Sequence, residues 1–156
     1  QIEKLSNDCN VSLAVSLHAS NNDLRDQLVP INRVHPIEKL LIACWDYAKK
    51  RANRFITFEY VMLDNINDSL EDAINLINLM KGFPAKVNLI PFNPFPGTSY
   101  KCSSEKKIQN FQSRLHNSGI VTTIRRTRGA DIDAACGQLA GKVRNKILTP
   151  LSEKNK

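Results

Sequence analysis

The chain has 156 residues and a formal net charge of +7, and 42% of its residues are hydrophobic while 24% are charged. These values are typical of one globular domain, and no apolar run is long enough to cross a bilayer, so we expect no membrane partner. The positive charge favours an anionic partner, of which nucleic acid is the commonest.

Only four cysteines occur, and none of them pairs in a C-x-x-C motif. This spacing excludes a disulfide-rich scaffold, and the three histidines do not complete a metal-ligand pattern. A reducing cytoplasm therefore suits the chain best. Because the chain begins with Gln1 and has methionines only at positions 62 and 80, we expect residues 1–156 to be a portion of a longer polypeptide.

Residues 11–19 alternate between apolar side chains and small or polar ones. A period of two predicts a β-strand. The polar face fits two interpretations, a lumen or cleft lined by small residues and an ordinary half-exposed strand with one face in water. The apolar set is Val11, Leu13, Val15 and Leu17, and the other set is Ser12, Ala14, Ser16 and His18.

Helices and strands alternate after this strand. Apolar residues at helical spacing predict a helix that begins at Ile37 and carries Cys44 on its apolar face. Further strands are expected over residues 55–63, 86–92 and 120–124. Further helices are expected from Asp68 to position 81, from Ser103 or Ser104 to position 118, and over residues 131–146. The helix that begins at Asp68 is expected to bury Leu70, Ile74, Ile77 and Met80.

This alternation predicts an α/β fold with a parallel sheet and right-handed crossovers. Two architectures satisfy it, a small doubly wound domain and the C-terminal half of an α/β barrel. Both place active groups at the carboxyl ends of the strands. His18, Asp64, Asn93 and residues 125–128 fall at or just beyond those ends.

Cys136 follows three arginines and lies between small residues. Small neighbours leave its sulfur accessible, and arginine charge stabilises the thiolate, which is the nucleophilic form of cysteine. A helix N-terminus capped by Asp131 would add to this stabilisation. Cys44, by contrast, lies among apolar residues and has the pattern of a core filler. We therefore predict that Cys136 is a catalytic residue.

Several segments together carry a resemblance to a known family; they are Ser16–Ala19, Leu28–Asn32, Glu59–Leu63, Asn88–Gly97 and Thr127–Gly141. In this order and spacing they resemble the radical S-adenosylmethionine (SAM) adenine-C2 RNA methyltransferases of the RlmN family. The resemblance runs from about Asp8 to Val143 and matches only the C-terminal half of that family's proteins.

The resemblance implies the C-terminal part of a partial (β/α) barrel that binds SAM and a 4Fe–4S cluster. It assigns SAM contacts to Ser16, Leu17, His18 and Asn93, and it makes Cys136 the cysteine that is methylated during the reaction. The methylated sulfur then delivers carbon to adenine C2 and leaves by forming a disulfide bond. The implied substrates are 23S rRNA and tRNA, and we expect the full-length enzyme to be a cytoplasmic monomer.

Parts of the family pattern are absent from this chain. It has no C-x-x-x-C-x-x-C cluster motif, no Gly-Glu SAM-binding segment and no counterpart of the second cysteine that resolves the adduct. We therefore expect the ligands of the cluster to lie outside the chain. On its own, the chain is expected neither to bind the cluster nor to methylate RNA.

Other interpretations remain open for single residues and for the function. His18 also fits a core histidine bonded to a backbone carbonyl, and Asn93 also fits a turn residue that folds its own backbone. Arg125, Arg126 and Arg128 fit either phosphate contacts or a solvated basic face. The alternatives for the function are the related adenine-C8 methyltransferases of antibiotic resistance and a non-catalytic RNA-binding module.

Overall fold

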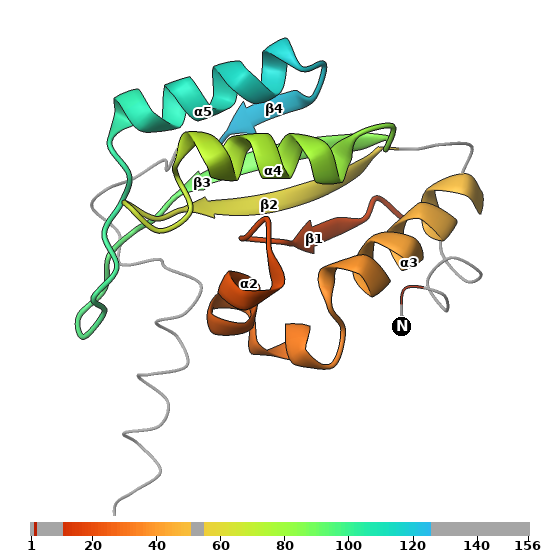
Figure 1. The fold of residues 1–156 in the computed structure, drawn as a ribbon, viewed down its shortest axis with the longest axis horizontal. Helices are drawn as coiled ribbons and strands as arrows, with labels where there is room; N and C mark the ends of the chain where they lie inside the picture. The colour runs from red at the N-terminus through yellow and green to blue at the C-terminus, as the bar shows by residue number, and fades with distance from the viewer. Residues whose placement is uncertain (1, 3–10, 51–54, 126–156) are drawn as a thin grey trace, which may run out of the picture.

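The computed structural model describes residues 2, 11–50 and 55–125 (Figure 1). Four strands form one sheet in the order β1-β2-β3-β4, and each neighbouring pair is parallel, so the predicted parallel α/β fold is confirmed. The strands are β1 (Ala14–Ser16), β2 (Ile56–Met62), β3 (Ala85–Pro91) and β4 (Val121–Ile124). The helices are α2 (Asn22–Leu28), the short 3₁₀ helix η1 (Pro30–Arg33), α3 (Ile37–Lys50), α4 (Leu70–Met80) and α5 (Glu105–Asn117).

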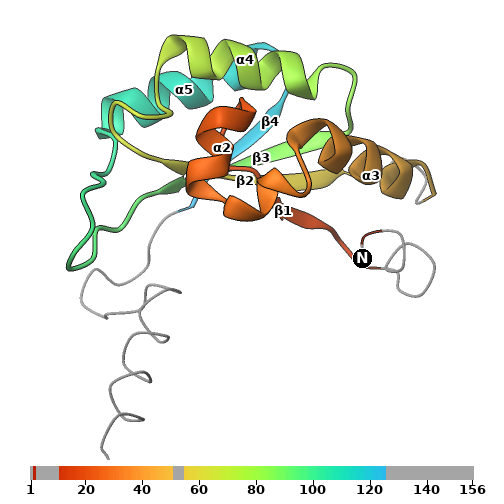
Figure 2. The same cartoon turned by 60° about the horizontal axis from the view of Figure 1, so that its bottom comes forward.

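Helices α3, α4 and α5 pack on one face of the sheet. In β2, Ile56, Phe58, Tyr60 and Met62 are buried, and the residues between them are partly exposed. The buried set joins side chains of the three helices in one core cluster. Figure 1 shows α4 and α5 side by side over the same face, and Figure 2 shows the same pairing after rotation. Strands in sequential order with helices on one side are the arrangement of a (β/α) barrel segment.

β1 is shorter than the predicted range of 11–19. Only Ala14–Ser16 pairs regularly with β2, and Val11 is 46% exposed. The alternation is confirmed at the centre of the range, because Val15 and Leu17 are buried while Ser16 is exposed. The strand ends because His18 adopts the left-handed backbone conformation, with a φ of 61°.

Helices α2 and η1 are not predicted by the sequence pattern. α2 begins after its N-cap residue Asn21, whose Oδ1 accepts a hydrogen bond from Leu24 N–H at 2.9 Å. Only Arg25 is buried among its seven residues, so no hydrophobic periodicity marks the helix. η1 follows with Pro30 at its start, where a missing backbone N–H costs nothing.

α4 begins one residue later than predicted. Its N-cap is Ser69 and not Asp68, and Ser69 forms a capping box with Asp72. Ser69 Oγ accepts a hydrogen bond from Asp72 N–H at 3.0 Å, and Ser69 N–H donates to Asp72 Oδ2 at 3.1 Å. The capping box therefore sets the first turn of the helix.

The buried face of α4 agrees only in part with the predicted one, because Met80 is buried as predicted and Ile77 is partly buried. Ala73, Leu76 and Met80 are buried, whereas Leu70 and Ile74 are 50% and 45% exposed. The prediction that Leu70 and Ile74 are buried is therefore wrong. Apolar residues lie on most sides of this helix, so periodicity alone does not fix its rotation. The rotation is fixed by packing in the core, where Ala73, Leu76 and Met80 lie.

α5 agrees with its prediction. Ser104 is its N-cap residue. The final helix, predicted over residues 131–146, lies outside the described residues. No helix in the described part of the chain is long and apolar enough to span a membrane. The residues that α5 buries are Ile108, Phe111 and Leu115.

Candidate functional site

The carboxyl ends of the four strands meet at one edge of the sheet, as parallel strands require. We call it the carboxyl edge. It consists of residues 16–18 at the end of β1, 63–68 after β2, 92–97 after β3 and Arg125 after β4. The candidates on this edge are Ser16, Leu17, His18, Asp64, Asn93 and Arg125. The candidates Arg126, Arg128 and Cys136 lie outside the described residues.

The imidazole of His18 is oriented by a backbone amide. Val61 N–H donates to His18 Nδ1 at 3.2 Å, so Nδ1 carries no proton and the neutral ring has its proton on Nε2. Burial lowers the pKa of His18, the Glu59 carboxylate raises it, and the Arg25 charge lowers it. The net shift is downward. Near neutral pH the ring is therefore uncharged and presents a directed Nε2–H donor.

We expect the stability of the fold to depend on the protonation of His18. Its pKa is lowered from 6.5 on folding, so the unfolded chain binds more protons over the window below 6.5. The stabilisation is fully present above pH 6.5 and is lost as the pH falls through the folded pKa. Urea denaturation measures the free energy of unfolding at about pH 7.5 and about pH 5. The decrease between these two pH values is expected to be larger for the wild type than for His18→Asn.

Asparagine is the matched replacement for His18 because it tolerates the left-handed backbone and keeps an acceptor for Val61 N–H. An equal decrease in the free energy of unfolding of the two proteins on acidification would contradict a lowered pKa for His18.

Arg25 is a buried residue of the site that sequence reasoning missed. Its side chain is 3% exposed, and it donates from Nε to Leu17 O at 3.0 Å and from Nη2 to Ser16 O at 3.0 Å. Its Nη1 donates to Asn32 Oδ1 at 2.6 Å, and Asn32 Nδ2 donates in turn to Asp26 Oδ1 at 2.6 Å. The only sequence signal was that Asn32 ends one of the segments that resemble the RlmN family.

Asn67 is a second buried residue that sequence reasoning missed. Its side chain is 0% exposed and links the end of β1 to the end of β2. Nδ2 donates to His18 O at 2.9 Å and to Val61 O at 2.6 Å, and Oδ1 accepts from Leu63 N–H at 2.8 Å. Tyr60 Oη donates to Asn67 O at 2.8 Å. An asparagine in a loop has no pattern that distinguishes this role from that of a turn residue.

Polar side chains cross the face of the sheet that α3, α4 and α5 do not cover. Ser16 is the register partner of Glu59, Glu59 of Asn88, and Asn88 of Thr123. Thr123 Oγ1 donates to Asn88 Oδ1 at 3.0 Å, which leaves the amide N–H groups of Asn88 as donors. This row lies next to the carboxyl edge, and it fits both the lumen and the half-exposed interpretation of the small, polar face of β1.

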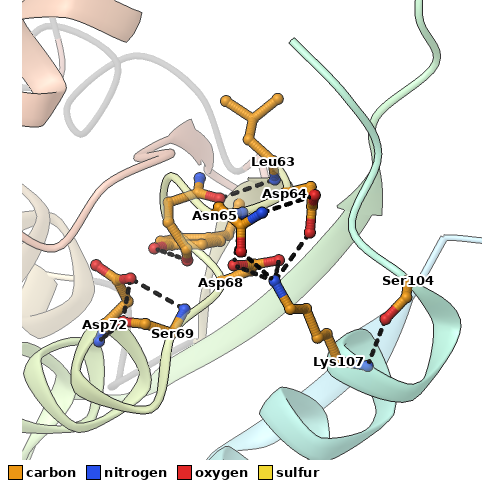
Figure 3. Close-up of polar contacts among 10 residues, drawn as sticks. Leu63, Asp64, Asn65, Asp68, Ser69, Asp72, Ser104 and Lys107 are labelled. Atoms are coloured by element: carbon orange, nitrogen blue, oxygen red, sulfur yellow. Dashed lines mark hydrogen bonds and ion pairs between the residues drawn. The ribbon is translucent and has the colours of Figure 1, made fainter.

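Asp64 is engaged by a lysine from α5 (Figure 3). Lys107 Nζ lies 2.8 Å from Asp64 Oδ1, 2.9 Å from Asn65 Oδ1 and 3.1 Å from Asp68 Oδ2. Hydrogen bonds to Asp64 and Asp68 raise the pKa of Lys107, so its ammonium group stays charged. The cluster ties α5 to the β2–α4 loop, and Asp64 therefore has a structural role at this edge.

Asn93 is exposed in the segment after β3. Next to it, Phe92 packs edge-on against Phe95 and Tyr100, with ring centroids 6.2 Å apart in each pair. Because β2 lies between β1 and β3, the ends of those two strands are about 10 Å apart. Within residues 11–50 and 55–125, no hydrogen bond joins Asn93 to His18. A single ligand that contacts both must span this separation.

The described residues do not fit an iron–sulfur cluster, which needs several cysteine thiolates. No group of three or more histidine, cysteine or acidic side chains that could hold a metal occurs in residues 11–50 and 55–125. Cys44 and Cys102 are both free thiols. Burial raises the pKa of Cys44 to about 12 and also raises the pKa of Cys102. Both therefore stay protonated, and Cys44 is the core filler predicted from the sequence.

A cavity of about 350 Å³ lies at the opposite, amino ends of the strands. Its lining includes Phe55, Gly82, Ala85 and Ile120, which lie at or near the starts of β2, β3 and β4. This position separates the cavity from the carboxyl edge.

Comparison with known proteins identifies relatives over most of the chain. No protein-family model matches the sequence. The chain is 53% identical over 144 residues to the dual-specificity RNA methyltransferase RlmN of Halorhodospira halophila, an alignment that covers 92% of this chain and 40% of that protein. The chain therefore spans about two fifths of the length of this relative.

Solved structures show the same relationship. A radical SAM methyltransferase from Sphaerobacter thermophilus matches with a TM-score of 0.83 and 46% identity, over 88% of this chain and 40% of that chain. A domain of the pyruvate-formate lyase-activating enzyme from Bacteroides vulgatus matches with a TM-score of 0.64 and 16% identity, over 80% of this chain and 73% of that chain. The second match is a similarity of fold alone.

Proposed function

Because this chain belongs to the RlmN family of radical SAM methyltransferases, we propose that it is the C-terminal portion of an enzyme that methylates adenine C2 in 23S rRNA and tRNA. The observation that carries the proposal is the 53% identity, over 92% of the chain, to a protein named as a dual-specificity RNA methyltransferase. The chain covers 40% of that protein. The activity therefore belongs to the longer enzyme, of which residues 1–156 form one partial domain.

In this proposal, SAM binds at the carboxyl edge against Ser16, His18 and Asn93. SAM carries a carboxylate, an amine, ribose hydroxyls and a purine, and the edge offers an exposed hydroxyl, a directed imidazole N–H and an exposed amide. The side chain of Leu17 is 0% exposed and packs in the core, so Leu17 contributes through its backbone position. When bound, SAM supplies the methyl group.

The methyl acceptor in this proposal is the thiolate of Cys136. Adenine C2 is electrophilic, and so is a sulfonium methyl group, so direct transfer between them is unfavourable. A thiolate would accept the methyl group from SAM and release S-adenosylhomocysteine, and the S-methyl group would react with C2 only after a radical had removed a hydrogen atom from it. Cys44 and Cys102 do not suit this role, because burial raises the pKa of both thiols. The family also uses a 4Fe–4S cluster, whose ligands we place outside this chain.

The identity of the methylated nucleoside tests the proposal. The full-length enzyme is incubated with SAM that carries an isotopically labelled methyl group and with 23S rRNA fragments or tRNA. The RNA is then digested and analysed by mass spectrometry against 2-methyladenosine and 8-methyladenosine standards. Labelled 2-methyladenosine is the expected product. Labelled 8-methyladenosine would reassign the chain to the related C8 enzymes, and RNA binding without any methylation would make it a non-catalytic module.

The basic stretch Arg125, Arg126 and Arg128 is the proposed RNA contact, and Arg125 is exposed at the end of β4. Changing all three residues to glutamine is expected to weaken binding to any RNA sequence. The slope of log affinity against log salt concentration is expected to fall by about 0.7 for each phosphate that the variant no longer neutralises, because each neutralised phosphate releases counterions. Fluorescence anisotropy with an unstructured RNA over a series of KCl concentrations measures this slope.

The control for charge alone is the triple change of Lys49, Lys81 and Arg114 to glutamine. These residues are exposed near the amino ends of the strands, away from the carboxyl edge. Its salt slope is expected to match that of the wild type. If both triple variants shift the slope equally, the arginines at the carboxyl edge belong to a solvated basic face.

A further inference from the structure

We propose that Arg25 and Asn67 are positioning residues that fix the backbone of residues 16–18 in the conformation that receives SAM. The inference rests on the proposed function for the role of SAM, and on the contacts of the described residues for the role of the two side chains. In this proposal, neither the Arg25 nor the Asn67 side chain contacts SAM. Each acts through the three residues at the end of β1.

The regular ladder between β1 and β2 ends within these residues: Ser16 still pairs with Glu59, and Leu17 N–H donates to Glu59 O at 3.0 Å. Thr57 N–H donates to Leu13 O at 3.0 Å. Because a parallel ladder repeats every two residues, its continuation would bring Val61 N–H to Leu17 O. The structure instead places Val61 N–H on His18 Nδ1, and Leu17 O accepts from Arg25 Nε. At the end of β1 the sheet therefore holds the amides, because Leu17 N–H and His18 N–H donate to Glu59 O at 3.0 and 3.2 Å, whereas side chains hold the carbonyl groups.

Two buried side chains bind all three carbonyl groups of this segment. Arg25 donates to Ser16 O and to Leu17 O, each at 3.0 Å, and Asn67 donates to His18 O at 2.9 Å. Arg25 is 3% exposed and Asn67 is 0% exposed. Buried polar groups and charges are costly unless they are hydrogen-bonded, so both side chains have strong preferences for these geometries.

The two contacts together maintain an unusual conformation. His18 has a φ of 61°, a region that residues with a side chain rarely adopt. Such a conformation persists only where the surrounding contacts over-determine it. Here Asn67 holds the carbonyl group of His18, Arg25 holds the preceding carbonyl groups, and Val61 N–H holds the ring. Loss of either buried side chain is expected to release the backbone and to misdirect the Nε2–H donor.

The experiment compares Arg25→Ala, Arg25→Lys and Asn67→Ala with Leu115→Ala in the full-length enzyme. Leu115 is 0% exposed in α5, which packs against β3 and β4. β2 separates these strands from β1, so truncation of Leu115 destabilises the fold at a distance from residues 16–18. Two quantities are measured for each variant. One is the affinity for SAM by calorimetry, and the other is the hydrogen-exchange rate of the peptide that contains Leu17 and His18.

Arg25→Ala and Asn67→Ala are expected to weaken SAM binding at least roughly tenfold and to speed exchange at Leu17 and His18, because a displaced positioning group costs more than its contact energy. Guanidinium at a concentration far below denaturing is expected to restore part of the affinity to Arg25→Ala and none to Asn67→Ala. Arg25→Lys retains the charge but not the planar set of donors, and it provides a folded variant where Arg25→Ala does not fold.

The inference is overturned if Leu115→Ala, at an equal loss of melting temperature, weakens SAM binding and speeds exchange at Leu17 and His18 as much as the Arg25 variants do. It is also overturned if the Arg25 and Asn67 variants match the wild type in both measurements. If the wild type binds no SAM while exchange at Leu17 and His18 still rises only in the Arg25 and Asn67 variants, the positioning role stands and the proposed function fails.

Discussion

Replacing Cys136 by alanine is expected to abolish methylation of RNA by the full-length enzyme while leaving its affinity for SAM unchanged. In the proposed function the sulfur of Cys136 carries the methyl group, and alanine has no atom that could accept it. SAM binding is expected to survive because the carboxyl edge, with Ser16, His18 and Asn93, remains intact. Transfer of labelled methyl groups to RNA measures the first effect, and calorimetry measures the second.

Cys44→Ala is the matched control, because it removes a thiol of the same chain that the structure places in the core. Cys44 is 0% exposed, and burial raises its pKa to about 12, so it supplies no thiolate at physiological pH. This control is expected to retain methylation with a modest loss of stability. Methylation by Cys136→Ala at close to the wild-type rate would exclude the carrier role.

Leu76→Ala in α4 is expected to lower the free energy of unfolding by about 2–5 kcal/mol. Leu76 is 0% exposed and packs in the core between α4 and the sheet, so the truncation leaves a cavity. Ile74→Ala in the same helix is expected to change the free energy of unfolding by less than about 1 kcal/mol. Ile74 is 45% exposed, and alanine is the better helix former.

Urea denaturation of the two variants under one buffer condition measures both free energies. The pair tests the rotation of α4 directly, since the two residues differ by two positions and face different directions on the helix. Equal losses, or a larger loss for Ile74→Ala, would support the inward face predicted from the sequence and contradict the observed one.

The fold could be predicted because its main signals are periodic. The alternation in residues 11–19 and the apolar run at residues 55–63 predict buried strands, and the helices between strands predict parallel pairing. The rotation of α4 could not be predicted in the same way. Leucine and isoleucine occur at five of its eleven positions and alanine and methionine at two more, so several faces are almost equally apolar.

Some residues of the candidate site could be predicted from the sequence, and others could not. Ser16, His18 and Asn93 could be placed at strand ends by sequence order and by the resemblance to the RlmN family, and the structure puts them on the carboxyl edge. Arg25 and Asn67 could not be found, because a buried polar side chain is fixed by tertiary hydrogen bonds that leave no periodic trace. Cys136, Arg126 and Arg128 lie outside the described residues, so their roles stay predictions.

The most direct test of the account is the chemical state of Cys136 in the enzyme itself. Trypsin cleavage after Arg128 and Lys142 gives a peptide of residues 129–142 with one cysteine and no methionine or histidine. Full-length enzyme incubated with SAM that carries a labelled methyl group is digested, and this peptide is sequenced by tandem mass spectrometry. A labelled methyl group on the sulfur of Cys136 is the expected result. An unmodified Cys136 in an enzyme that methylates RNA, or a labelled methyl group on a different residue, would contradict it.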